Sequence, residues 1–103
     1  MKAWVNGDVI DEAEARVSVF DHGITVGDGV FETAKVVDGV PFALSRHLAR
    51  LGDSARGLGL PAPASDDVRR AVEETFRANT ASLDRSLRLR ITLTGGVGPL
   101  GSD

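Results

Sequence analysis

The chain has 103 residues, of which 42% are hydrophobic and 26% charged, a balance typical of one globular domain and not of a disordered segment. Twelve basic and fifteen acidic residues give a net charge of −3, which argues against binding to nucleic acid or to an anionic membrane surface. There is no cysteine and the two histidines are far apart in sequence, so we expect no disulfide and no metal site. Because no signal peptide and no apolar run of membrane-spanning length is present, the expected location is the cytoplasm.

Five short segments predict β-strands. Asn6-Gly7 and Asp38-Gly39, each between apolar residues, are strong signals for two hairpin turns. Pro41 places the strand after the second turn at an edge of the sheet or at that strand's first residue. In the last segment Leu and Ile alternate with Arg and Thr, which predicts one buried face. The predicted strands cover residues 3–5, 8–10, 30–37, 40–44 and 87–94.

Two helices are predicted between the fourth and fifth strands. The first has Ser45 as its N-cap and ends before Gly59 and Pro61. The second begins at residues 65–67, whose acids suit the positive end of a helix, and stops near Asn79. Apolar residues keep helical spacing at Leu44, Leu48, Leu51, Ala55 and Leu58 and again at Val68, Val72 and Phe76. This order predicts an α+β fold of two layers, a mainly antiparallel sheet with two helices on one face.

Two stretches carry residues suited to binding. Residues 20–33 contain three glycines within seven positions, which allows the backbone to approach a ligand closely, together with several carboxylates. The alternative is a tight connection whose carboxylates accept hydrogen bonds from nearby backbone N–H groups. His47 and Arg50 are three residues apart, so they neighbour each other on one helix face, where a guanidinium can take a phosphate. The alternative there is a solvated helix face.

Together, Gly27-Asp28-Gly29-Val30-Phe31-Glu32-Thr33 and the later His47-x-x-Arg50-Leu51-x-x-Ser54-Ala55 resemble the fold type IV pyridoxal-phosphate enzymes. That family includes branched-chain and D-amino-acid aminotransferases and aminodeoxychorismate lyases. The resemblance runs along essentially the whole chain and implies that residues 1–103 form the small N-terminal α/β domain of a two-domain enzyme. It further implies a homodimer or larger assembly, with pyridoxal 5′-phosphate in the cleft between the domains.

The resemblance also implies roles for single residues. Arg50 matches the arginine that holds the cofactor phosphate, and Phe31 matches an aromatic residue that lines the substrate pocket. Glu32 supports that pocket or is simply a residue of the strand surface. The loop Gly96-Val97-Gly98 resembles one that reaches the active site. The catalytic lysine, which forms the Schiff base in this family, is expected in a second domain beyond Asp103, so no residue of this chain is expected to be catalytic.

Three functions fit these observations. The first is an aminotransferase that moves an amino group between a branched-chain or D-amino acid and a 2-oxo acid, and we favour it as the broader class. The second is an aminodeoxychorismate lyase that releases pyruvate and 4-aminobenzoate. The third, from another class, is a non-catalytic ligand-binding or dimerisation module, since the only lysines are Lys2 and Lys35. The glycine-rich end after the last strand suggests a longer natural chain, and the 103 residues alone are expected to be inactive.

Overall fold

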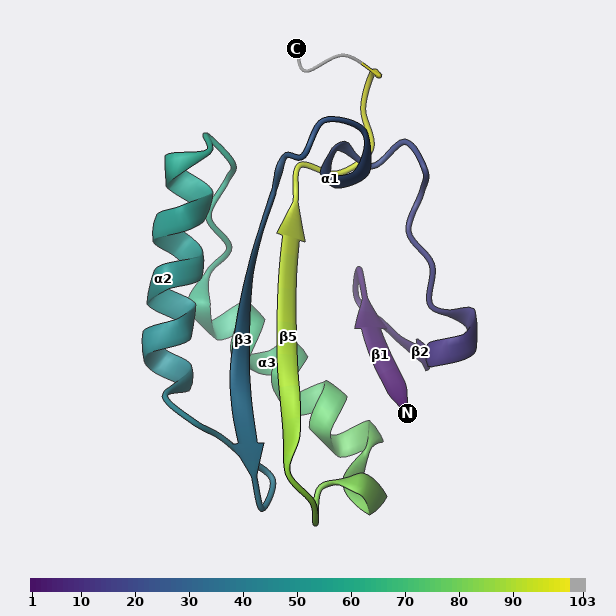
Figure 1. Cartoon of the computed structure of the whole chain (residues 1–103), viewed down its shortest axis with the longest axis vertical. Coiled ribbons are helices and arrows are strands. Elements are labelled where there is room, and N and C mark those ends of the chain that lie inside the picture. Colours follow the sequence, from purple (N-terminus) through teal and green to yellow (C-terminus); the bar gives the residue numbers. More distant parts are fainter. Residues whose placement is uncertain (101–103) are drawn as a thin grey trace.

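The first sheet is a two-stranded hairpin of β1 (Lys2–Val5) and β2 (Asp8–Asp11), seen in a computed structural model that describes residues 1–100 (Figure 1). Asn6 and Gly7 between the strands both have positive φ, 49° and 98°, as a two-residue hairpin turn of this kind requires. The predicted first hairpin is therefore confirmed. A 3₁₀ turn, η1 (Glu12–Glu14), follows it.

The second sheet contains β3 (Gly29–Val37), β4 (Val40–Pro41) and β5 (Leu87–Thr94) in the antiparallel order β4-β3-β5. The register pairs Gly29 with Thr94 at one end and Val36 with Leu87 at the other. The strand that contains Pro41 lies at the sheet edge, as predicted, but it is shorter than residues 40–44. The reason is Ala43, whose left-handed backbone (φ 56°) turns the chain into the next helix.

Two helices, α2 (Leu44–Gly57) and α3 (Ser65–Ala78), cover one face of this sheet, and Figure 1 shows α3 crossing behind β3 and β5. Alternate residues of β3 are buried beneath them while the residues between are exposed. The predicted two-layer α+β fold is thus confirmed, although the strands form two sheets and not one. The buried hydrophobic side chains are Ala34, Val36, Leu48, Leu51, Ala55 and Val72.

The helix ends are only partly as predicted. The first helix begins at Leu44, so Ser45 lies inside its first turn and its hydroxyl accepts a hydrogen bond from Arg69 of α3 instead of capping the helix. Gly59, with φ of 75°, follows the end of α2 as expected. A 3₁₀ turn, η2 (Thr80–Ser82), leads from α3 toward β5. Among residues 1–100, no helix is both long and apolar enough to span a membrane.

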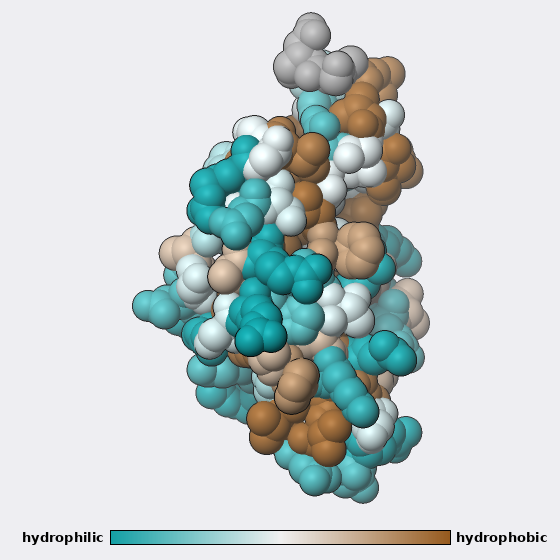
Figure 2. All heavy atoms as spheres, turned by 60° about the vertical axis from the view of Figure 1, so that its left-hand side comes forward, coloured by the Kyte–Doolittle hydropathy of each residue, from teal (hydrophilic) through white to brown (hydrophobic). Residues whose placement is uncertain are grey.

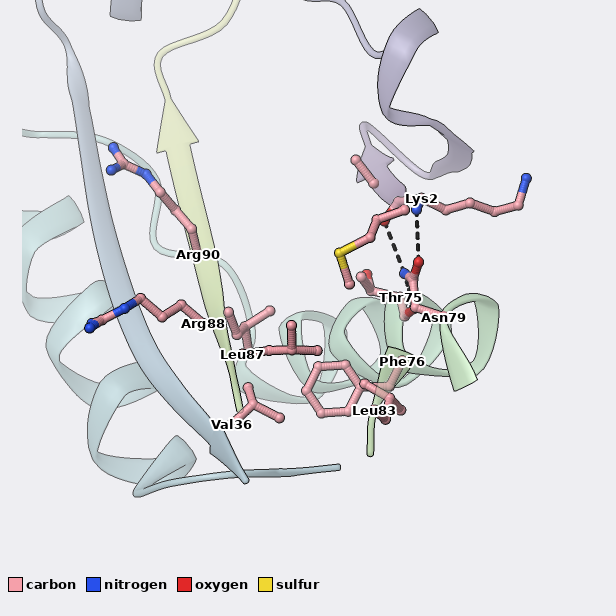
Figure 3. A pocket seen from close by; sticks show the side chains of 12 residues that line it. Lys2, Val36, Thr75, Phe76, Asn79, Leu83, Leu87, Arg88 and Arg90 are labelled. Atoms are coloured by element: carbon pink, nitrogen blue, oxygen red, sulfur yellow. Dashed lines mark hydrogen bonds between the residues drawn. The ribbon is translucent and has the colours of Figure 1, made fainter. Parts of the chain in front are cut away.

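The predicted stop at Asn79 is the C-cap of α3, and its side chain also forms hydrogen bonds with β1. Its side-chain oxygen accepts a hydrogen bond from the Lys2 backbone N–H at 2.7 Å, and its amide nitrogen donates to the Lys2 carbonyl at 3.0 Å (Figure 3). The same nitrogen donates to the Thr75 carbonyl at 2.8 Å. One largely buried amide therefore fixes β1 against α3.

Candidate functional site

The glycine loop before β3 contains a short helix, α1 (His22–Thr25), that the sequence did not predict. Asp21 caps it: one carboxylate oxygen accepts from the Gly23 N–H at 2.8 Å and the other accepts from the Thr94 hydroxyl at 2.9 Å. Helix N-terminal N–H groups lack partners within the helix, so an aspartate at this position stabilises the turn. Asp21 thereby joins the start of α1 to the end of β5.

The loop predicted to reach the active site lies directly against this glycine loop, and the two segments come together at one end of the molecule (Figure 1). The His22 backbone N–H donates to the Gly96 carbonyl at 2.8 Å, and the Gly95 N–H donates to the Asp28 carbonyl at 2.9 Å. These bonds run across segments about seventy positions apart in the chain. The structure therefore brings together two of the predicted site segments, residues 20–33 and 96–98.

The His22 side chain closes the contact between the two segments. Its Nε2 lies 2.6 Å from the Pro99 carbonyl, which can only accept, so Nε2 carries the proton. Its Nδ1 faces the Asp28 carboxylate at 3.9 Å. A Cβ placed on Gly98 would lie 2.7 Å from His22 Nε2, so the ring fits only against a glycine. His22 is thus a residue of the site region to which the sequence analysis assigned no role.

Phe31 lies on the face of the sheet that the helices leave open. It is 55% exposed, and the Arg90 guanidinium carbon lies 4.0 Å from the centre of its ring. A cation stacked on an aromatic face is attracted to the electrons of the ring. Further cations share this open face because they occur at alternate positions of the two paired strands. The exposed residues here are Phe31, Thr33, Lys35 and Val37 on β3 and Arg88, Arg90 and Thr92 on β5.

Glu32 faces the opposite side, beneath the helices, because consecutive strand residues point to opposite faces. It is 7% exposed and shares its face of β3 with the buried Ala34 and Val36. Glu32 is therefore not a residue of the strand surface, one of the two interpretations that the sequence left open. It also does not face the same side as Phe31, its neighbour in the sequence.

Helix α2 brings the side chains of His47 and Arg50 to Glu32. His47 Nδ1 donates a hydrogen bond to Glu32 Oε1 at 2.7 Å, and Arg50 Nε lies 3.7 Å from the same oxygen. The side chain of Arg50 is 66% exposed, whereas that of Glu32 is 8% exposed. The predicted adjacency of His47 and Arg50 on one helix face is confirmed, and His47 forms a hydrogen bond to the buried Glu32 carboxylate.

Arg50 fits the phosphate of pyridoxal 5′-phosphate by the chemistry of its donors. Its ion pair with Glu32 is made through Nε, and its two terminal nitrogens form no hydrogen bond with residues 1–100. A guanidinium presents such nitrogens as a planar fork that matches two phosphate oxygens. The largely exposed side chain leaves room for a ligand.

Two hollows lie on the surface of the described part of the chain. One, of about 430 Å³, is lined by Lys35, Val37, Val40 and Phe42 on the open face near β4. The other, of about 220 Å³, lies between β5, β1 and α3, and Figure 3 shows Arg88 and Arg90 extending away from it toward β3. Figure 2 shows hydrophobic surface gathered toward both ends of the long axis. Neither hollow is lined by Arg50, Phe31 or the 96–98 loop.

Known proteins resemble this chain in both sequence and fold. Residues 29–103 match the family described as amino-transferase class IV. The chain is 45% identical over its full length to a "Putative branched-chain-amino-acid aminotransferase" of Methanocaldococcus jannaschii, of which it covers 35%. It is 31% identical, over 95% of its length, to aminodeoxychorismate lyase of Bacillus subtilis, of which it covers 33%.

Solved structures agree with the sequence matches. A hypothetical aminotransferase from Mycobacterium tuberculosis in its PLP-bound form superposes with a TM-score of 0.83 at 34% identity, over 94% of this chain and 34% of that one. This chain thus spans about a third of the length of the proteins that it matches. Because the family match covers most of the chain and the fold is the same, the chain belongs to the class IV aminotransferase family.

Proposed function

We propose that the protein is a pyridoxal-phosphate-dependent aminotransferase and that Arg50 of this chain binds the cofactor phosphate. The observation that carries the proposal is the exposed Arg50 guanidinium, which is paired through Nε and whose two terminal nitrogens form no hydrogen bond with the described residues. Class IV aminotransferases depend on this cofactor, and a structural relative contains it. Arg50 would fix the phosphate end of the cofactor and so orient its reactive ring.

Bound pyridoxal phosphate supplies an aldehyde that combines with amines and a ring that withdraws electrons from them, which no protein side chain supplies. The proton transfers need a lysine, and neither lysine of this chain suits the role. Lys2 is paired with Asp11 at 2.8 Å, and Lys35 is an exposed residue in the middle of β3. We therefore place the catalytic lysine in a second domain beyond Asp103.

The open sheet face is proposed to meet the substrate. The phenyl ring of Phe31 can pack against an apolar side chain, and Arg90, stacked on that ring, can bind a carboxylate. Amino acids and 2-oxo acids both carry an α-carboxylate, and a branched-chain substrate also carries an apolar side chain. The M. jannaschii relative supports branched-chain amino acids as donors. We propose that the Gly96-Val97-Gly98 loop borders the same site.

An aminodeoxychorismate lyase is the second candidate, supported by the B. subtilis relative. Its substrate also carries a carboxylate and needs the same cofactor, so the residues described above serve both reactions. The products separate them, because a transaminase forms a 2-oxo acid from the donor whereas the lyase releases pyruvate and 4-aminobenzoate. A homodimeric assembly and a cytoplasmic location remain predictions from the sequence.

The test uses the full-length protein that contains this chain. Its affinity for pyridoxal phosphate is measured by titration. Separate activity assays then supply branched-chain amino acids with 2-oxoglutarate, D-alanine with 2-oxoglutarate, and aminodeoxychorismate alone. Arg50→Ala should lower cofactor affinity at least tenfold, because a charge-assisted bidentate contact contributes about 1.5–3 kcal/mol.

The matched control is Arg56→Ala on the same helix, which breaks only an exposed pair with Asp53 and should leave cofactor affinity unchanged. Equal cofactor affinity in Arg50→Ala and the parent protein would contradict the role of Arg50. A parent protein that ignores pyridoxal phosphate altogether would favour the non-catalytic module.

A further inference from the structure

We propose that Glu32 is a positioning residue that holds Arg50 ready for the cofactor phosphate. This inference rests on the proposed function, since it concerns how the phosphate-binding guanidinium is placed. Three side chains from two elements form the arrangement: Glu32 from β3, and His47 and Arg50 from α2. Glu32 acts on the cofactor only through Arg50.

The burial of Glu32 needs an explanation. Its side chain is 8% exposed on a face otherwise occupied by Ala34 and Val36, and a buried carboxylate is costly unless it is paired. A well-packed apolar residue at such a position is often at least as stabilising as the ion pair that it replaces. The stability of the fold therefore does not explain a carboxylate at this position. A role in positioning Arg50 does.

Glu32 is a fixed point from which to hold another side chain. Its backbone lies within β3, paired with Ile91 of β5, and its carboxylate is enclosed beneath α2. Arg50, in contrast, is 66% exposed and has many accessible rotamers when it is free. The pairing of an exposed guanidinium with a buried carboxylate restricts the guanidinium to one region of the surface.

The pairing also leaves Arg50 free to bind. His47 Nδ1 occupies Glu32 Oε1 at 2.7 Å, and Arg50 Nε approaches that same oxygen only to 3.7 Å, which is an ion pair and not a hydrogen bond. If His47 did not bind Glu32, the carboxylate could accept a bidentate pair of hydrogen bonds that involves the terminal nitrogens of Arg50. The shared oxygen therefore holds the cation in place without using the donors that a phosphate needs.

The expected gain in affinity is entropic. Because Glu32 already restricts the Arg50 side chain, binding of the phosphate removes less of its conformational freedom. For one long side chain immobilised in advance, this corresponds to about 2- to 10-fold in affinity for the phosphate-bearing ligand. The gain should appear only with a ligand that carries the phosphate. Pyridoxal, which lacks the phosphate, does not engage Arg50 and should show no change.

The experiment measures the Kd of the full-length protein for pyridoxal phosphate and for pyridoxal by absorbance titration. Glu32→Gln keeps the side-chain size and an oxygen for His47 but removes the charge that attracts Arg50. We expect it to weaken pyridoxal phosphate binding about 2- to 10-fold and to leave pyridoxal binding within twofold. The matched control is Glu74→Gln on α3, an exposed contact of Trp4, which should change neither Kd.

Two further variants make the result unambiguous. In an Arg50→Ala background, Glu32→Gln should have no additional effect on either Kd, because the group through which it acts is gone. If Glu32→Gln fails to fold, Glu32→Asp retains the charge but withdraws it from Arg50 by one methylene, and it should show the same selective loss.

The possible failures are distinguishable. Unchanged pyridoxal phosphate affinity in Arg50→Ala overturns the proposed function and this inference together. A large effect of Arg50→Ala with no effect of Glu32→Gln and Glu32→Asp overturns this inference alone. Equal losses for pyridoxal phosphate and pyridoxal, or tighter phosphate binding after the carboxylate is removed, also overturn it, because they indicate a purely structural role or charge repulsion.

Discussion

Replacing Gly98 by alanine should loosen the contact between the glycine loop and the segment after β5. The new methyl group would lie 2.7 Å from His22 Nε2 and 2.9 Å from His22 Cε1, which is closer than non-bonded carbon atoms approach in proteins. The ring is not free to retreat, because its side chain is 11% exposed and Nε2 donates to the Pro99 carbonyl at 2.6 Å. Either the ring turns and loses that bond, or residues 95–99 move outward.

The size of the effect follows from overpacking, which typically costs about 1–3 kcal/mol. If this cost falls on the contact between the two segments, the population in which that contact is open rises about 5- to 140-fold. The opening is measured as the hydrogen-exchange rate, in the full-length protein, of the backbone N–H groups of His22, Gly95 and Gly98. These groups donate hydrogen bonds between the two segments. Exchange at all three should accelerate together.

Two controls isolate the cause. Gly57→Ala adds the same methyl group within α2, where a Cβ would meet nothing within 4 Å, and should not accelerate exchange at these amides. In a His22→Ala background the space is already free, so adding Gly98→Ala should have no further effect. The reasoning is refuted if Gly98→Ala leaves exchange unchanged, or if it accelerates exchange equally with and without the His22 ring.

Three further predictions concern stability. Leu51 is 1% exposed, so Leu51→Ala should lower the free energy of unfolding by about 2–5 kcal/mol in a urea titration, and a loss under about 1 kcal/mol would contradict its central place in the core. Asn79→Ala removes both hydrogen bonds to the Lys2 backbone, so amide exchange in β1 should accelerate while exchange in β3 does not. The hydrogen bond from the Lys2 ammonium, with its charge, holds the pKa of Asp11 below its ordinary value of 3.8. The resulting small stabilisation is complete above that pH and is lost as pH falls through the lowered pKa, and an NMR titration of Lys2→Met should show the pKa returning toward 3.8.

Much of the fold was predictable because local chemistry decides it. Asn-Gly and Asp-Gly turns with positive φ fixed both hairpins, and the alternation of Leu and Ile with Arg and Thr fixed β5. The start of α2 was mispredicted, because a left-handed Ala43 is not indicated by its residue type. Helix α1 was missed because four residues give no periodic signal and its cap depends on Thr94, remote in sequence.

The candidate site was predictable only as separate motifs. The spacing of His47 and Arg50 correctly placed both on one side of a helix, but not against Glu32. Alternation along β5 indicated that Arg88 and Arg90 share a face, yet the register that stacks Arg90 on Phe31 is a property of the paired strands. Contacts between elements far apart in sequence carry no local signal, and these contacts define the site.

The opposed directions of Phe31 and Glu32 have a consequence for how such proteins diversify. A change at residue 31, 33 or 92 alters only the open face of the sheet. It does not touch the pair of Glu32 and Arg50 on the opposite face. With the roles proposed for Phe31 and Arg50, one scaffold can therefore acquire new substrate preferences while its cofactor-binding residues stay unchanged. Insertion or deletion of a single residue within β3 has the contrary effect, because it would exchange the two surfaces and disrupt both at once.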